Sequence, residues 1–173
     1  MCPTSGMTIP TICADGTYQS ETNQSTCIDC PAGSACPVKT VSPILCNAGN
    51  YSAGKSVSCT ICADGTYQPA TSQSSCIDCP AGSQCPDKAL APTACNPGHY
   101  STAKSVSCLE CADGTYQNNT NQSTCIDCPA GSSCSNKSVL PVVCSSGQYS
   151  ISRSISCTVC PAGIFDCCIS VMV

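Results

Sequence analysis

Cysteine is the residue type in this chain whose spacing could do chemistry. The 173 residues include 22 cysteines, and many of them stand in C-x-x-C pairs. Such pairs can bind zinc, exchange disulfides as thiols, or be oxidised into structural bridges. The pairs are Cys27/Cys30, Cys59/Cys62, Cys76/Cys79, Cys108/Cys111, Cys125/Cys128 and Cys157/Cys160.

Zinc binding is the main alternative to disulfide formation as an interpretation of these pairs. The four cysteines of residues 59–79 read C-x2-C-x13-C-x2-C, which is close to the spacing of structural zinc sites. However, Cys27 and Cys30 have no second pair upstream, only Cys13, and zinc ligation of this kind would leave Cys36 as a free thiol. We therefore favour disulfides and keep an intracellular zinc-binding CxxC repeat protein as the alternative.

The sequence offers no constellation typical of an enzyme. Its single histidine, His99, takes the place that Asn50 and Gln148 occupy in equivalent segments, which indicates a variable loop position. Nucleophilic catalysis needs a positioned base, and thiol–disulfide exchange needs a helix or charge that lowers a thiol pKa. Repeated single acids do not make a calcium loop. We predict no catalytic residue, no cofactor and no metal site.

The cysteines are positioned by an internal repeat. The segment CADGTYQ begins at Cys13, Cys62 and Cys111, 49 residues apart each time, and the cysteines in between follow the same period. A fixed period of this size is typical of stacked repeat proteins. It predicts a partial leading repeat at 1–12, three Cys-rich repeats at 13–61, 62–110 and 111–159, and a truncated fourth at 160–173.

A shorter pattern, Cys-x2-Gly-x-Tyr followed by a Ser/Thr-rich stretch and a second Cys, occurs twice in each repeat. The Gly fits a turn that needs a positive φ, so each loop is predicted to be a small two-stranded ribbon with its aromatic ring in a local core. The Pro-containing stretches between these loops read as extended connectors. The aromatic positions are Tyr18, Tyr51, Tyr67, Tyr100, Tyr116, Tyr149 and Phe165.

The half-repeat also suggests how the cysteines pair. Each Gly-x-Tyr loop would be closed by one bridge, and the remaining cysteines would pair across CPAGS. An alternative, Cys30–Cys46 with Cys36–Cys59 in each unit, stays open because sequence does not fix connectivity. The predicted bridges are Cys13–Cys27, Cys30–Cys36, Cys46–Cys59, Cys62–Cys76, Cys79–Cys85, Cys95–Cys108, Cys111–Cys125, Cys128–Cys134 and Cys144–Cys157.

Composition sets the fold class. There is no Trp and one Phe, so covalent cross-links must replace a large apolar core. Six basic and ten acidic residues give a net charge of −4, which excludes a phosphate-binding basic patch, and no apolar run could span a bilayer. We predict a small disulfide-rich fold, mostly irregular with short β-ribbons, forming an elongated tandem-repeat rod with almost no helix.

The run C-x2-G-x-Y…S-x-C-x2-C-P-A-G-x2-C resembles the ephrin type-A/B receptor-like cysteine-rich repeat. It is similar to the wider growth-factor-receptor cysteine-rich and tumour-necrosis-factor-receptor-like group. The resemblance implies stalks or ligand-contacting segments of surface or secreted proteins, and it marks no ligand-contacting residue. It is carried by Cys13, Gly16, Tyr18, Cys27, Cys30, Pro31, Gly33 and Cys36, and again within 62–85 and 111–134.

We therefore expect a non-enzymatic extracellular or cell-surface segment that serves as a spacer, adhesion or receptor-type protein-binding module. Its partners would be other extracellular proteins or glycans, and not nucleic acid; the parent protein could be anchored elsewhere. N-x-S/T sequons make Asn23, Asn50, Asn118, Asn121 and Asn136 glycosylation candidates.

The two ends of the chain fall inside repeat units. Cys2, Cys160, Cys167 and Cys168 have no partner that the repeat predicts. We expect the chain to be a piece of a longer array.

Overall fold

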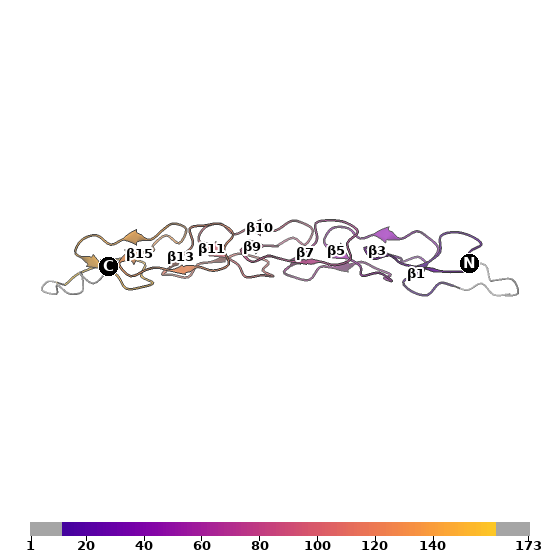
Figure 1. Ribbon diagram of the computed structural model, residues 1–173, viewed down its shortest axis with the longest axis horizontal. Helices are drawn as coiled ribbons and strands as arrows, with labels where there is room; N and C mark the ends of the chain where they lie inside the picture. Colours follow the sequence, from indigo (N-terminus) through magenta and orange to yellow (C-terminus); the bar gives the residue numbers. More distant parts are fainter. Residues whose placement is uncertain (1–11, 162–173) are drawn as a thin grey trace. The chain divides into compact units, whose positions relative to one another are not determined.

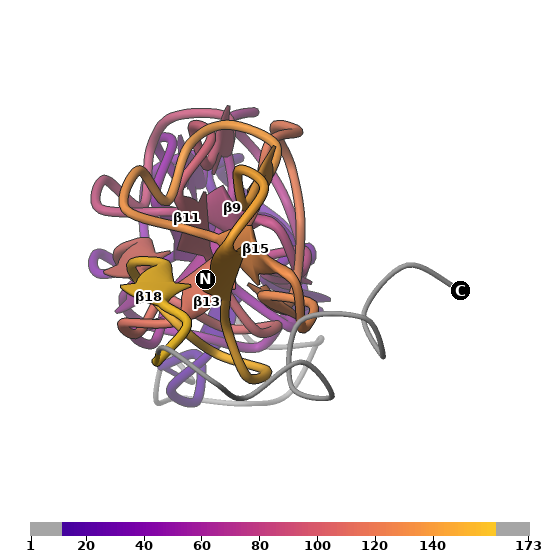
Figure 2. The same cartoon turned by 90° about the vertical axis from the view of Figure 1, so that its left-hand side faces the viewer.

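The computed structural model describes residues 12–161, and in this range the secondary structure consists of two-residue strands without a helix. Figures 1 and 2 accordingly draw short arrows joined by loops. Each odd-numbered strand pairs antiparallel with the strand that follows it, so the described residues form a series of separate hairpins. The predicted class, disulfide-rich tandem units with short β-ribbons, is confirmed.

The chain divides into two compact units, each of which holds a series of hairpins. The first unit includes the described residues up to Asp78 and Cys85–Ala91; the second includes Cys79–Gln84 and the described residues from Pro92 onward. The hairpins of the first unit are β1 (Thr17–Tyr18) with β2 (Ile28–Asp29), β3 (Ser34–Ala35) with β4 (Ile44–Leu45), β5 (Asn50–Tyr51) with β6 (Thr60–Ile61), and β7 (Thr66–Tyr67) with β8 (Ile77–Asp78).

The second unit repeats the same arrangement. Its hairpins are β9 (Ser83–Gln84) with β10 (Thr93–Ala94), β11 (His99–Tyr100) with β12 (Leu109–Glu110), β13 (Thr115–Tyr116) with β14 (Ile126–Asp127), β15 (Ser132–Ser133) with β16 (Val142–Val143), and β17 (Gln148–Tyr149) with β18 (Thr158–Val159). Two paired strands of this length are not stable alone, so each hairpin depends on its cross-links and its neighbours.

A C-x2-G turn begins each hairpin. In the turn that starts at Cys46, Gly49 has a φ of 77°, which costs glycine little, and Asn50 N–H donates to the Asn47 carbonyl at 3.1 Å. The next hairpin attaches directly to this turn, because Cys62 N–H donates to the Gly49 carbonyl at 2.9 Å. The positive φ predicted for the Gly before each Tyr is therefore confirmed.

Each 49-residue repeat holds three hairpins and not two loops with a connector. Gly33 turns the CPAGS segment with a φ of 78°, and the chain then comes back so that Ser34 pairs with Leu45 and Ala35 with Ile44. The prediction of extended connectors was wrong for this reason: the Pro-containing stretch supplies the second strand of a hairpin. The equivalent pairs are β9–β10 and β15–β16.

Sulfur fills the interior. The largest fully buried side chains among the described residues are cysteines, accompanied by serine, whereas the six tyrosines are half-buried. The predicted aromatic core is thus replaced by cystine, which can be packed between strands too short to carry a layer of large side chains. The most buried cysteines are Cys30, Cys36, Cys46, Cys62, Cys79, Cys95, Cys111 and Cys128.

The position six residues after the cysteine that opens each described hairpin is buried or half-buried. In successive hairpins it holds a Gln, a Cys and a Ser, as at Gln68, Cys85 and Ser101. The polar members are hydrogen-bonded: Gln117 Nε2 donates to the Thr124 carbonyl at 3.0 Å. Among the described residues no buried side-chain nitrogen or oxygen lacks a partner, which is the condition for burying polar groups at low cost.

Replacing Ser101 with alanine should destabilise the second unit by about 1 kcal/mol. The Ser101 side chain is buried, and its hydroxyl donates to the Ser83 carbonyl at 2.7 Å, so the variant leaves that carbonyl without this donor. Urea unfolding of the oxidised protein measures the change. The control is Ser135→Ala at an exposed position. Equal midpoints for the two variants would contradict the role given to the buried hydroxyl.

Main-chain hydrogen bonds join consecutive hairpins within each unit. In the first unit Gly49 N–H donates to the Gln68 carbonyl at 2.8 Å and Ser72 N–H to the Cys46 carbonyl at 2.7 Å. In the second, Gly98 N–H donates to Gln117 at 2.7 Å and Asn121 N–H to Cys95 at 2.9 Å. Because these bonds use the backbone, the step from one hairpin to the next is set largely independently of the side chains.

Candidate functional site

The cysteines that carry the predicted chemistry are brought together as disulfides. The structure forms Cys13–Cys27, Cys30–Cys36, Cys46–Cys59, Cys62–Cys76, Cys95–Cys108, Cys111–Cys125, Cys128–Cys134 and Cys144–Cys157, with Cα–Cα distances of 5.7–5.9 Å. Cys79, Cys85 and Cys160 are disulfide-bonded as well, whereas Cys2, Cys167 and Cys168 lie outside the described residues. Peptide mapping of the unreduced protein is the direct test of the predicted pairing.

The zinc alternative is not supported. Of the four cysteines with zinc-like spacing, Cys59 is bonded to Cys46 and Cys62 to Cys76, and Cys79 is also in a disulfide. Oxidised sulfur offers no thiolate to a metal. Among residues 12–161, moreover, no group of three or more His, Cys, Asp or Glu side chains is arranged to hold a metal ion.

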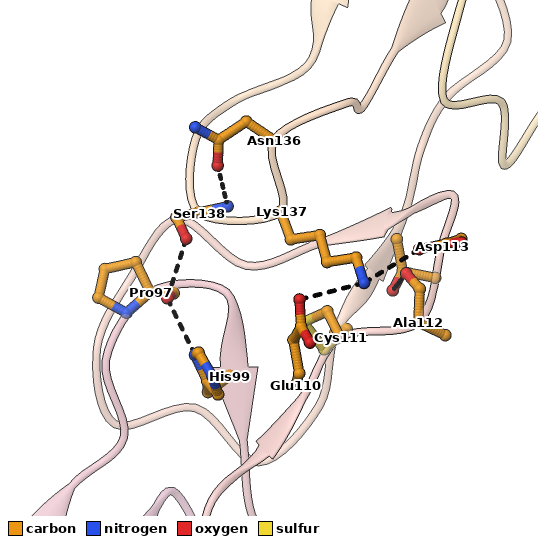
Figure 3. A network of polar contacts seen from close by, with 11 residues as sticks. Pro97, His99, Glu110, Cys111, Ala112, Asp113, Asn136, Lys137 and Ser138 are labelled. Atoms are coloured by element: carbon orange, nitrogen blue, oxygen red, sulfur yellow. Dashed lines mark hydrogen bonds and ion pairs between the residues drawn. A yellow bond between two sulfur atoms is a disulfide. The ribbon is translucent and has the colours of Figure 1, made fainter.

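His99 has a structural setting. It lies half-buried in β11, and its Nδ1 is 3.3 Å from the carbonyl oxygen of Pro97 in the turn that precedes it. The Ser138 hydroxyl donates to the same carbonyl at 3.1 Å, as Figure 3 shows. The ring therefore contacts a turn whose Pro97 carbonyl also accepts a hydrogen bond from the β15–β16 hairpin.

The repeated acids pair with the repeated basic residues. Lys39 Nζ lies 2.8 Å from Asp15, and Lys88 Nζ lies 2.9 Å from Asp64. In the third repeat Lys137 lies 3.0 Å from Asp113 and 3.2 Å from Glu110, and Figure 3 shows its ammonium between the two carboxylates. A second series joins Lys55 to Asp29 and Arg153 to Asp127. These pairs are surface contacts between a hairpin and the next hairpin along the chain or the one after it.

The ion pairs shift ionisation in the expected directions. The hydrogen bond and the charge of Lys39 lower the pKa of Asp15, and Lys88 does the same for the pKa of Asp64. Hydrogen bonds that the Lys137 ammonium donates to Asp113 and Glu110 raise the pKa of Lys137. The carboxylates are solvent-exposed and the lysines are half-buried, so water and salt weaken the pairs.

The stability of the fold should be flat across neutral pH and fall in acid. The folded-state pKa of Asp64 is below the unfolded value of about 3.9, so its stabilisation is present above about pH 4 and is lost as pH falls through the folded value. Lys137 is the reverse case: its stabilisation is complete below about pH 10.4 and is lost at higher pH.

Thermal unfolding as a function of pH measures this dependence. The Lys88→Met variant should lose the Asp64 part of the acid slope and become less sensitive to salt. An acid slope identical to that of the wild type would show that the Lys88–Asp64 pair makes no contribution.

Aliphatic side chains are concentrated on the outside. The second strand of each described hairpin is exposed along its length, with Ile44 and Leu45 57% and 59% exposed in β4, and Val142 and Val143 63% and 76% exposed in β16. Others of this kind are Ile28, Ile61, Ile77, Leu109, Ile126 and Val159. The sequence analysis did not predict this exposure. Its physical cause is that two-residue strands and cystines leave an interior too small for large aliphatic side chains.

The five sequon asparagines differ in their surroundings. Asn23, Asn121 and Asn136 are exposed, whereas Asn50 and Asn118 are half-buried. The structure thus separates candidates that the sequence alone treats as equal.

Comparison with known families addresses the repeat directly. Residues 49–91 and 98–138 match the family model described as tyrosine-protein kinase ephrin type A/B receptor-like. Each matched segment includes C-x2-G turns, their hairpins and disulfides of the kind described above. The chain carries ephrin receptor-like cysteine-rich repeats. The first and second matches place ephrin receptor-like repeats in both compact units.

No curated protein matches the chain. Within the described residues, no helix is present that is long and apolar enough to cross a membrane. The ephrin receptor-like repeats therefore provide the basis for assigning a function.

Proposed function

We propose that the chain is a non-enzymatic extracellular segment of a surface or secreted protein, which acts as a spacer and offers receptor-type surface for protein binding. The observation that carries this proposal is the repeat itself: ephrin receptor-like units that are each closed by disulfides. Disulfides at this density form and persist in oxidising compartments, which supports an extracellular or cell-surface location.

The spacer role rests on the way the hairpins are joined. Each hairpin contains disulfide-bonded cysteines, and main-chain hydrogen bonds such as Gly131 N–H to the Ser150 carbonyl, at 3.0 Å, join it to the next. In a tandem array of this type each repeat contacts only its neighbouring repeats, and length is added without a new core. An array built in this way holds attached groups at defined separations.

The binding role rests on the exposed aliphatic side chains. The second strands carry exposed Ile, Leu and Val side chains in both units, and exposed apolar surface is what protein-interaction sites use. The chain also carries few charges, and most of the basic residues are already paired with acids. Extracellular proteins or glycans are thus the partners expected, and polyanions such as nucleic acid are not.

Location and redox state in the native cell test the proposal together. Antibody detection on intact cells, combined with thiol labelling before and after reduction, should find the protein outside the cytosol with its cysteines blocked until reductant is added. A cytosolic protein whose cysteines label without reduction would refute the proposal. Small-angle scattering of the secreted chain tests the predicted rod, and a compact particle would argue against a spacer.

A further inference from the structure

We propose that Asn136 carries an asparagine-linked oligosaccharide in the folded protein, and that Asn50 remains unmodified. The inference rests on the proposed extracellular function, because only chains that enter the secretory pathway meet the enzyme that transfers such oligosaccharides. It goes beyond the presence of sequons, since five are present and the structure distinguishes them.

Asn136 stands in the exposed turn between β15 and β16 with one side of its amide engaged. Its Oδ1 accepts the Ser138 N–H at 2.9 Å, which fixes the side chain in an Asx turn. Figure 3 shows the Nδ2 nitrogen on the side of Asn136 away from Ser138 and Pro97. The atom that accepts a sugar is thus presented to solvent, on a side chain whose orientation is already set.

The transfer conserves this turn. Nδ2 of Asn136 forms a bond to C1 of the first sugar of a lipid-pyrophosphate-linked oligosaccharide, the bond from C1 to the pyrophosphate oxygen breaks, and one Nδ2 proton is lost as the lipid pyrophosphate leaves. No oxidation or reduction occurs. The product keeps Oδ1 as an acceptor and one N–H on the nitrogen, so the hydrogen bond from Ser138 N–H is retained.

Asn50 is the opposite case. It lies half-buried in β5, with its backbone paired opposite Ile61, and its Nδ2 donates to the Ala48 carbonyl at 3.1 Å. The sequon hydroxyl belongs to Ser52, which is buried, with only 2% of its surface exposed. A sugar on Asn50 would have to be accommodated at a half-buried strand position whose Nδ2 is already engaged with the Ala48 carbonyl, so folding selects the unmodified chain.

The other sequons are constrained by the chain around them. Asn118 is half-buried. Asn23 and Asn121 occupy left-handed turn positions with φ of 62° and 59°, and Asn121 Oδ1 accepts the Ser83 hydroxyl at 3.0 Å from an earlier hairpin. The Asn121 side chain is thereby held toward its neighbour. We expect the occupancy at these positions to be lower than at Asn136.

The test is site-resolved occupancy in protein secreted from a eukaryotic cell behind a cleavable signal sequence. Enzymatic release of the glycans in heavy-oxygen water converts each modified Asn to a labelled Asp, which peptide mass spectrometry counts. Most of the Asn136 peptide should be labelled and the Asn50 peptide should be unlabelled. Secreted, fully oxidised protein with an unlabelled Asn136, or with Asn50 labelled to the same extent, would overturn the inference.

Matched variants separate the sequon from the fold. Asn136→Asp removes the acceptor nitrogen but keeps a capping oxygen, as Asp87 does at the equivalent turn, where its Oδ1 accepts Ala89 N–H at 2.8 Å. This variant should be secreted normally with one glycan fewer. The double variant Asp87→Asn with Ala89→Ser rebuilds the sequon in that turn and should gain one glycan. If the gain fails while secretion continues, exposure of this turn does not determine modification.

Failure of this inference differs from failure of the proposed function. The inference fails on occupancy in secreted, oxidised protein. The proposed function fails on the location and thiol state of the protein in its native cell, whatever its glycans.

Discussion

Replacing Gly114 with alanine should disrupt the stacking of hairpins in the second unit, while the same change at Gly147 should be tolerated. Gly114 has a φ of 74°, and a Cβ added to it would overlap the main-chain carbonyl of Arg153 in a later hairpin. Arg153 cannot move away freely, because its N–H donates to the Cys128 carbonyl at 2.8 Å. The clash is therefore with backbone that is itself held in place.

Gly147 supplies the control because its backbone conformation is the same and no described residue approaches it. Its φ is 80°, and an added Cβ would meet no described atom within 4 Å. Both variants lose about 1–2 kcal/mol from placing alanine in the left-handed region. Only Gly114→Ala adds the cost of overpacking, about 1–3 kcal/mol or more.

Hydrogen exchange and denaturant midpoints of the two oxidised variants measure the difference. In Gly114→Ala, exchange should accelerate at Cys128 N–H and Arg153 N–H, whose bonds join the three hairpins involved, and these amides should stay protected in Gly147→Ala. Equal destabilisation would show that backbone conformation alone accounts for the glycine, and that the close approach contributes nothing.

This close approach recurs through the chain and explains a feature that the sequence did not reveal. An added Cβ would also meet the carbonyl of Lys55 from Gly16, and that of Asn121 from Gly82. Lys55 has a φ of 50° and Asn121 a φ of 59°. A lysine at positive φ goes against local preference, so tertiary contact with a glycine 39 residues earlier must enforce it. Local patterns cannot report a constraint imposed at that distance.

The sequence predicted two of the three hairpins in each repeat and missed the one that begins at CPAGS. The C-x2-G signal is present in CPAGS as it is in CADG, but the tyrosine that marks the other loops is replaced by Ala35, Gln84 or Ser133. The spacing of successive C-x2-G turns also runs 17, 16 and 16 residues through each repeat, and this unevenness hides the shorter period. The hairpin at CPAGS therefore depends on the glycine turn and does not require an aromatic residue.

The identity of the core was harder to predict, because general burial preferences fail in this chain. Gln117 and Ser150 are buried at 3% and 5% exposure, while Val143 and Ile151 are 76% and 72% exposed. Strands of two residues cannot enclose large aliphatic groups, and cystines take the available volume. Small polar side chains fill what remains, since each can be satisfied by a nearby main-chain group.

Removing the short Cys128–Cys134 bridge should cost more than removing the longer Cys111–Cys125 bridge. Loop-closure entropy alone predicts the reverse: about 2 kcal/mol for a separation of 6 residues and about 3 kcal/mol for 14. Burial opposes entropy here, because Cys128 and Cys134 are 0% and 3% exposed, whereas Cys125 is half-buried. The short bridge places both sulfurs inside, and their loss leaves a void in a core that has little else.

The contacts of Cys128 increase the expected difference. Its carbonyl accepts both Arg153 N–H at 2.8 Å and the Ser152 hydroxyl at 3.1 Å, and Cys134 N–H donates to the Ser154 carbonyl at 3.1 Å. Releasing this bridge therefore loosens the attachment of the next hairpin as well as its own loop. We expect about 3–5 kcal/mol for the Cys128→Ala/Cys134→Ala variant and about 3 kcal/mol for Cys111→Ala/Cys125→Ala.

Denaturant midpoints of the two double variants rank the bridges, with intact mass confirming that the remaining disulfides have formed. Hydrogen exchange at Ser52 N–H, which donates to the Gln73 carbonyl at 3.1 Å in the first unit, shows whether the rest of the chain is native. If the longer bridge proves the more costly one to remove, chain entropy governs the stability of these repeats. If the short bridge is costlier, the buried sulfur is a packed core in its own right, and ephrin receptor-like repeats of this kind are stabilised by what their cystines fill as well as by what they connect.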